Sequence, residues 1–195
     1  LLRMKFRIRP PRRKMYLSFV SSDEFVNLAR KYLDDLFTPI VTKNNVEHVI
    51  LDQGISLQHH RENMNFLRKA KLIAVYRDAR DNYSDLITHN VYSFANTRDV
   101  KEFVKLFKYL HRKQQEVEKD ADVLMLKFED LIFHYEESLK RIADFAGLDM
   151  KDHVKKRAFF NPDVSIKNVG MWKNILSKSE ADMIASELPE YLYNA

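Results

Sequence analysis

The stretch KLIAVYRDARDNYS, residues 71–84, decides the fold. Its first part, Leu72–Tyr76, is apolar on both faces, which is typical of a parallel strand covered by helices on both sides. The polar residues that follow open a helix, which we expect from about residue 80 to 89. Ligands of parallel α/β sheets bind at the carboxyl ends of strands, so this pattern predicts a ligand site at the turn after Tyr76.

On both sides of this stretch, predicted helices alternate with predicted strands. Further strands are expected at 47–52 (EHVILD) and 122–128 (DVLMLKF). Capping boxes at Ser21–Glu24 and Ser177–Glu180 open the first and last helices, and Gly147 is a natural helix end. The predicted helices cover residues 22–37 (with Pro39 helping to end this one), 59–68, 80–89, 98–118, 131–146 and 178–188. Strands separated by helices predict an α/β fold with a parallel sheet.

The composition is that of one globular domain, and it excludes several classes of protein. The 195 residues contain no apolar run of the roughly 18 residues that a membrane span needs, and no signal-peptide pattern opens the sequence. The absence of cysteine excludes disulfides, cysteine-bound zinc and thiol catalysis. It fits a reducing compartment, and we expect a cytoplasmic location.

The net charge of +5 is concentrated at the beginning of the sequence. Residues 1–14 contain seven basic residues and no acidic one, so the remainder sums to −2. Such an arm can bind polyanions such as nucleic acid or acidic glycans, or it can be a solvated boundary segment. A nucleic-acid-binding domain would carry its basic residues on the folded body, so we do not expect nucleic acid as the partner. We divide the chain into this arm or boundary segment, residues 1–20, and an α/β domain, residues 21–195.

Arg77 and Ser84 are the candidate ligand-binding residues of the turn after the Leu72–Tyr76 strand. The planar guanidinium of Arg77 is suited to bind phosphate. Ser84 lies about two helical turns further along and can add a hydroxyl donor. Alternatively, Arg77 pairs with Asp78 or Asp81 and only ties the turn together.

Two later segments carry further charged residues. Lys127–Leu131 (KFEDL) ends the third predicted strand, and we expect its acids to cap the next helix and to pair with neighbouring Arg or Lys. Ser165–Asn174 (SIKNVGMWKN) lies in a region, 158–176, that we expect to be irregular. There, Gly170 lets the backbone approach a ligand closely, two lysines supply positive charge, and Trp172 can stack or anchor the loop.

Taken together and in this order, the three segments resemble the sulfotransferases that depend on 3′-phosphoadenosine 5′-phosphosulfate (PAPS). The resemblance rests on strand–RDxRD–helix, on K-[FY]-E-D-L with a helix ending FAGL, and on a late N-x-G-x-W-K loop, and it covers about residues 47–188. It implies a three-layer α/β sandwich with a parallel sheet, similar to P-loop NTPases. It also implies transfer of a sulfuryl group from PAPS to a hydroxyl or amine of an acceptor, such as a carbohydrate, without a metal.

The resemblance also implies roles for individual residues. Arg77 and Ser84 match the pair that holds the 3′-phosphate of PAPS, and a late loop closes over the nucleotide. The matching residues of that loop are Gly170, Met171, Trp172 and Lys173. Like phosphoryl transfer, the reaction depends on positioning and on stabilisation of charge more than on covalent catalysis.

The resemblance further implies that a base, which deprotonates the acceptor, lies at or beyond the strand that precedes Leu72–Tyr76. This places four residues in range: Asp52, Gln53, His59 and His60. Asp52 ends the predicted strand, whereas the two histidines titrate nearest neutral pH. The alternatives are that the histidines belong to a solvated helix start and that Asp52 bonds to backbone or to a lysine.

The chain departs from the family pattern at three places. Ala79 stands where proline is usual, and Asp85, an acid that would repel phosphate, stands where the serine usually lies. The glycine-containing loop that cradles the 5′-phosphosulfate has no counterpart, since no glycine precedes residue 54. We therefore expect an N-terminally incomplete version of the domain. The alternatives are a non-catalytic nucleotide-binding or scaffold relative, and a polyanion-binding protein that uses residues 1–14.

Overall fold

The computed structural model describes residues 20–89 and 99–193, so the basic residues 1–14 lie outside the described residues. The chain divides into two units, Leu1–Ile50 and Leu51–Ala195. In its described part the first unit contains helix α1, Ser22–Asn44. The elements of the second unit are, in chain order, η1 (Leu57–His59), α2 (His60–Met64), β1 (Leu72–Tyr76), α3 (Ala79–His89), α4 (Val100–His111), α5 (Gln114–Val117), β2 (Val123–Lys127), α6 (Phe128–Phe133), α7 (Tyr135–Ala146), η2 (Met150–Asp152), α8 (Pro162–Ser165), η3 (Ile166–Asn168), α9 (Trp172–Ile175), α10 (Lys178–Glu187) and η4 (Pro189–Tyr191).

Helix α1 is longer than predicted. Its start is confirmed, because Ser21 Oγ accepts the Glu24 N–H at 3.2 Å and the Glu24 carboxylate accepts the Ser21 N–H at 2.8 Å. The predicted end near Phe37 is wrong, since the helix continues through Pro39. A proline removes one N–H donor from the helix, and here that loss is tolerated. The helix ends at Asn44 and is capped by Asn45, which has a left-handed φ of 49°.

The strand predicted at 47–52 does not form. All six residues are exposed, Ile50 by 91%, and none of them belongs to a described strand. The apolar part of the segment is only Val49–Leu51. So short a run, without a partner strand among the described residues, buries too little surface to offset the entropy of ordering an extended chain.

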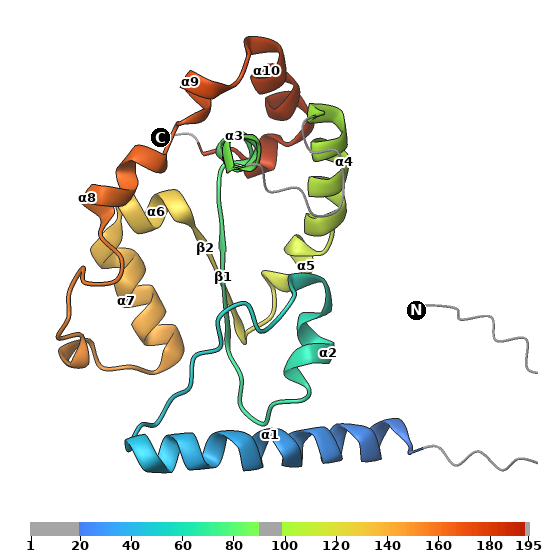
Figure 1. Cartoon of the computed structure of the whole chain (residues 1–195), viewed down its shortest axis with the longest axis vertical. Helices are drawn as coiled ribbons and strands as arrows, with labels where there is room; N and C mark the ends of the chain where they lie inside the picture. Colours follow the sequence, from blue (N-terminus) through green and yellow to red (C-terminus); the bar gives the residue numbers. More distant parts are fainter. Residues whose placement is uncertain (1–19, 90–98, 194–195) are drawn as a thin grey trace, which may run out of the picture. The chain divides into compact units, whose positions relative to one another are not determined.

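The sheet of the second unit consists, among the described residues, of β1 and β2. The strands are parallel, as predicted, with Leu72 opposite Val123 and Tyr76 opposite Lys127. Both strands therefore end at the same edge, where α6 begins directly and α3 begins after two residues (Figure 1). The register thus brings the turn after Tyr76 next to the first residues of α6.

Two of the predicted helices are split. The helix predicted at 98–118 is α4 followed by α5, with a break at Arg112–Lys113, and position 98 lies outside the described residues. The region predicted as one helix at 131–146 contains the end of α6 and all of α7, with a break at His134. Helix α7 ends at Gly147, whose φ of 75° confirms the predicted C-cap.

Other predicted boundaries are met in part. Ser177 and Glu180 form the predicted capping box of α10. The helix predicted at 59–68 is shorter and ends with α2 at Met64, because residues 65–71 form turns and coil. The region 158–176 is irregular only in the sense that it contains short helical turns. None of the described helices is both long enough and apolar enough to cross a membrane.

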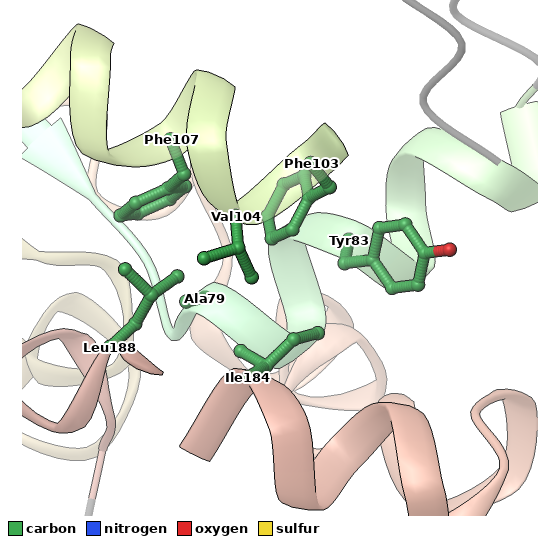
Figure 2. Packing of buried hydrophobic residues seen from close by; sticks show 7 residues of the cluster. All are labelled: Ala79, Tyr83, Phe103, Val104, Phe107, Ile184 and Leu188. Atoms are coloured by element: carbon green, nitrogen blue, oxygen red, sulfur yellow. The ribbon is translucent and has the colours of Figure 1, made fainter. Parts of the chain in front are cut away.

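The core of the second unit packs α3 against α4 and α10 (Figure 2). The ring centroids of Tyr83 and Phe103 are 4.8 Å apart, and those of Phe103 and Phe107 are 5.5 Å apart. Ile184 and Leu188 close the other side of the cluster. Because close packing fixes the apolar face of α3, the polar residues of its first turn have defined positions at the end of β1.

Candidate functional site

The three segments that the sequence singled out meet at the carboxyl end of β1. The Asp78 N–H donates to Glu129 Oε1 of α6 at 2.9 Å, across 51 positions of sequence. Arg77 Nη2 donates to the carbonyl oxygen of Asn168, 91 positions away. The turn after β1 therefore contacts both the KFEDL segment and the late loop.

Arg77 lies at the centre of this meeting point, with 17% of its side chain exposed. Besides its bond to Asn168, Nη2 is 3.1 Å from Met171 Sδ, and Cζ lies 5.3 Å from the ring centroid of Phe128. Nη1 is 4.0 Å from Asp85 Oδ1. Nε is buried and has no hydrogen-bond partner among the described residues. The guanidinium thus retains donor capacity for an anionic ligand.

Asp78 is paired with Arg80 and not with Arg77. The carboxylate accepts Arg80 Nε at 3.0 Å and Nη2 at 2.5 Å, and it also accepts the Tyr193 N–H at 2.9 Å. Burial raises the pKa of Asp78, but the bonds from Arg80 and Tyr193 outweigh it, so the pKa lies below its ordinary value. Among the described contacts, Arg77 forms no hydrogen bond or ion pair with Asp78 or Asp81, so the alternative in which it only ties the turn together is not what the structure shows.

The carboxylate of Asp81 binds two backbone N–H groups of the late loop. Oδ2 accepts the Gly170 N–H at 2.6 Å, and Oδ1 accepts the Trp172 N–H at 2.9 Å. The residue is only 1% exposed. Burial raises the pKa of Asp81, and the two N–H bonds and the charge of Arg77 lower it by less, so the pKa lies above its ordinary value.

Glu129 is a site residue that the sequence did not place correctly. We expected this acid to cap the next helix or to pair with a basic residue, but it is fully buried and accepts the Asp78 N–H, while Oε2 has no partner among the described residues. Burial raises the pKa of Glu129, and the charges of Asp78 and Asp81 raise it further against the opposing hydrogen bonds. The described residues include no group of three or more His, Cys, Asp or Glu arranged to hold a metal ion.

Ser84 and Asp85 lie one after the other on α3, and only one of them faces Arg77. The Ser84 hydroxyl is fully buried and donates to the Arg80 carbonyl oxygen at 2.9 Å. Asp85 is half exposed, and its carboxylate lies between Arg77 Nη1, at 4.0 Å, and His89 Nδ1, at 3.2 Å. The acid therefore occupies the side of the helix nearest to the guanidinium.

The late loop presents its other side chains around the same turn. The Arg80 guanidinium lies 4.2 Å from the ring centroid of Trp172, within the range of a cation–π contact. Gly170 has a φ of 74°, a conformation that disfavours any residue with a Cβ atom. The side chain of Lys173 lies beside this glycine, with Cε 3.8 Å from the position that a Cβ atom would occupy.

The candidate bases lie in different environments. Asp52 is in an exposed turn, and the side chain of His59 is 61% exposed. His60 is buried, and its Nε2 lies 3.1 Å from Asp120 Oδ2. The solvated helix start that we considered for both histidines therefore describes His59 only.

A recess of about 300 Å³ lies between α6, α7 and the segment 153–160. Its walls are mostly apolar, and none of the predicted site residues lines it. One wall is Phe160, whose ring packs edge-on against Phe128, and Phe128 in turn underlies Arg77. The recess is thus separated from Arg77 by two aromatic rings.

Comparison with protein families places this geometry in context. A family model described as the sulfotransferase family matches residues 4–152, which is more than half of the chain. The chain belongs to the sulfotransferase family. The match includes β1, α3, β2, α6 and α7, and it confirms the resemblance at the level of the family. A comparison with curated proteins found no match. The late loop of this sulfotransferase lies beyond the matched range, so its place in the site rests on its contacts with Arg77 and Asp81.

Proposed function

We propose that this sulfotransferase uses PAPS as its sulfuryl donor and that Arg77 binds the 3′-phosphate. The observation that carries the proposal is the position of Arg77. Its largely buried guanidinium lies at the carboxyl end of a parallel strand, has an unpaired Nε, and borders a loop with two lysines. A phosphate can accept two parallel hydrogen bonds from such a group, and the charges make these bonds strong.

The late loop is proposed to supply the rest of the phosphate environment. Lys167 and Lys173 bring positive charge, Met171 places its Sδ 3.1 Å from Arg77 Nη2, and the side chain of Lys173 lies beside Gly170. Arg77 Nη2 also donates to the loop carbonyl of Asn168, which places the guanidinium directly against the loop.

Ser84 is proposed as the weaker phosphate ligand. Its hydroxyl must exchange the bond to the Arg80 carbonyl before it can donate to a phosphate. Asp85 adds negative charge next to Arg77 and opposes phosphate binding. The affinity for the 3′-phosphate therefore depends chiefly on Arg77 and on the loop.

The proposed reaction is an in-line transfer to a hydroxyl, for example of a carbohydrate. The acceptor oxygen attacks sulfur, the bond from sulfur to the bridging phosphate oxygen breaks, and adenosine 3′,5′-bisphosphate leaves. A base takes the proton of the acceptor hydroxyl. Asp52 and His59 are candidates with exposed side chains, and His60 is a candidate whose imidazole must first leave Asp120. A three-layer sandwich related to P-loop NTPases is the fold that we propose around the parallel pair.

A second function that we propose, for these 195 residues taken by themselves, is nucleotide binding without transfer. Residues 1–20 contain no Gly-x-x-[KR]-[ST] pattern, and no glycine precedes Gly54. The 195 residues thus carry a candidate 3′-phosphate site and no recognisable cradle for the 5′-phosphosulfate. Both functions require adenosine 3′,5′-bisphosphate to bind, and only the first requires transfer.

Titration calorimetry with adenosine 3′,5′-bisphosphate tests the shared part of both functions. Arg77→Ala should weaken binding about 30- to 150-fold, because a charge-assisted phosphate contact contributes about 2–3 kcal/mol. Arg61→Ala is a matched control, since this arginine is exposed and pairs with Asp120 away from the turn. An unchanged affinity in the Arg77 variant would show that the site is assigned wrongly.

A further inference from the structure

We propose that Asp81 is a positioning residue that holds the late loop, Ser165–Asn174, against the turn that carries Arg77. Seating of the loop and binding of the 3′-phosphate are then coupled through the first turn of α3. This inference rests on the proposed function for its nucleotide, whereas the latch itself rests on contacts within the chain.

The geometry of the latch is that of a carboxylate bound by two backbone donors. Both oxygens of Asp81 are used, one by the Gly170 N–H at 2.6 Å and one by the Trp172 N–H at 2.9 Å. The side chain is sealed from solvent, so water does not compete for these bonds. No other residue type of this size presents two acceptor oxygens and no donor.

Neighbouring residues of the same turn hold the loop at two further points. Arg80 lies over the ring of Trp172, and its orientation is fixed by its two bonds to Asp78. Arg77 donates to the carbonyl oxygen of Asn168. Arg77 just before α3, and Arg80 and Asp81 in its first turn, thus contact the loop before, at and after Gly170, so a shift of the loop cannot leave Arg77 undisturbed.

Burial of the Asp81 carboxyl has a cost to the fold. Burial raises the pKa of this carboxyl despite the two N–H bonds, which means that the folded protein would accept a neutral group more readily. Groups kept against their effect on stability are commonly functional ones. Positioning of the loop is the function that the two N–H bonds of Asp81 support.

The chain offers a direct reporter, because Trp172 is its single tryptophan and lies in the loop. Asp81→Asn keeps the size of the side chain but turns an N–H₂ group toward one of the two backbone donors. The variant should increase acrylamide quenching of Trp172 fluorescence and weaken adenosine 3′,5′-bisphosphate binding about tenfold, the loss expected for one charged hydrogen bond. Circular dichroism and thermal melting establish that the variant is folded.

Asp85→Asn is the matched control, since it removes an acid beside Arg77 that has no described bond to the loop. It should leave quenching at the wild-type level and should not weaken binding. Gly170→Ala disturbs the loop without changing Asp81, because a residue with a Cβ atom is disfavoured at the Gly170 φ of 74°. This variant replaces Asp81→Asn as the test if Asp81→Asn does not fold. It should increase quenching and weaken binding by up to about 5- to 30-fold.

The outcomes separate the latch from the proposed function. Unchanged quenching in folded Asp81→Asn, or increased quenching with unchanged bisphosphate affinity, overturns the coupling even if Arg77→Ala binds weakly. Increased quenching together with an Arg77→Ala affinity equal to wild type supports the latch and overturns the assignment of the nucleotide site. If Asp81→Asn does not fold, unchanged quenching in Gly170→Ala overturns the latch.

Discussion

Two turns of the second unit follow segments that were predicted to be strands, and they differ in burial and in contacts. The turn after Tyr76 is largely buried and binds residues 51 to 115 positions away in the sequence. The turn at Asp52–Gly54 is exposed, and no described hydrogen bond or ion pair engages the Asp52 side chain. The first turn has the fixed geometry that a binding site needs, and the second does not.

The difference comes from strand pairing. Register between β1 and β2 places the turn after Tyr76 against Glu129, and the core under α3 fixes the helix that follows. Residues 47–52 have no such partner among the described residues. The turn after Tyr76, where we propose that the nucleotide binds, is therefore preorganised, whereas the proposed base Asp52 has no such fixed position, and the following changes test that contrast.

The largest expected effect is on stability, at Asp78. Asp78→Ala leaves Arg80 buried without its partner, and breaking a buried ion pair from one side costs about 3–5 kcal/mol. Urea unfolding followed by circular dichroism measures the loss. Asp52→Ala should change the free energy of unfolding by less than about 0.5 kcal/mol, as is usual for an exposed side chain. Equal effects of the two substitutions would remove the contrast between the turns.

The two histidines give a smaller contrast of the same kind. His60→Ala should cost about 1–2 kcal/mol, because the buried imidazole loses its bond to Asp120. His59→Ala should stay within about 0.5 kcal/mol of wild type. Thermal melts of both variants measure this. A loss of sulfuryl transfer in His59→Ala, with stability intact, would assign the base; a His59 variant as unstable as the His60 variant would contradict the structure.

The smallest effect concerns the pH dependence at Glu129. Its raised pKa means that the folded protein binds the proton more readily than the unfolded chain, so the ionised group destabilises the fold at neutral pH. Glu129→Gln keeps an oxygen for the Asp78 N–H and should be at least as stable as wild type at pH 7. The difference should shrink as the pH falls toward the ordinary carboxyl pKa of about 4.

Asp78→Asn is the control of opposite sign for that experiment. The lowered pKa of Asp78 means that its stabilisation is present above the ordinary carboxyl pKa and is lost as the pH falls through the folded value. Asp78→Asn should therefore be less stable than wild type at pH 7 and approach it only in acid. A Glu129→Gln variant that is less stable than wild type at pH 7 would contradict the raised pKa of Glu129.

Much of the second unit could be predicted from local patterns in the sequence. The strand β1, the capping box at Ser177 and the C-cap at Gly147 each depend on a few neighbouring residues, and each is confirmed. The expected helical cover on both faces of β1 is wrong for the described residues, because Ile73 and Val75 on one face are exposed. The strand at 47–52 fails because a strand requires a partner, and a partner is not visible in a local pattern. The wrong helix end predicted near Pro39 has a similar cause. Whether a helix continues through a proline depends on the helix as a whole and not on the residues next to the proline.

The candidate site shows the same division. Order along the chain was enough to single out the three segments, and to name Arg77 and Gly170. The pairing of Asp78 with Arg80, the burial of Glu129 and the two loop bonds of Asp81 depend on distances between segments, which single-sequence patterns do not contain. The sequence did contain one signal for these contacts, namely the two acids Asp78 and Asp81 at the start of the helix that follows β1. An acid that is buried at such a position needs hydrogen-bond donors from neighbouring segments.

The most direct test of the central claim combines removal of Arg77 with removal of the 3′-phosphate. Affinities of wild type and Arg77→Ala for adenosine 3′,5′-bisphosphate and for adenosine 5′-monophosphate form a thermodynamic cycle. We predict a coupling of about 2–3 kcal/mol, because the arginine and the 3′-phosphate each matter only when the other is present. Equal weakening of both nucleotides by Arg77→Ala, with a coupling near zero, would contradict the assignment of Arg77 to the 3′-phosphate.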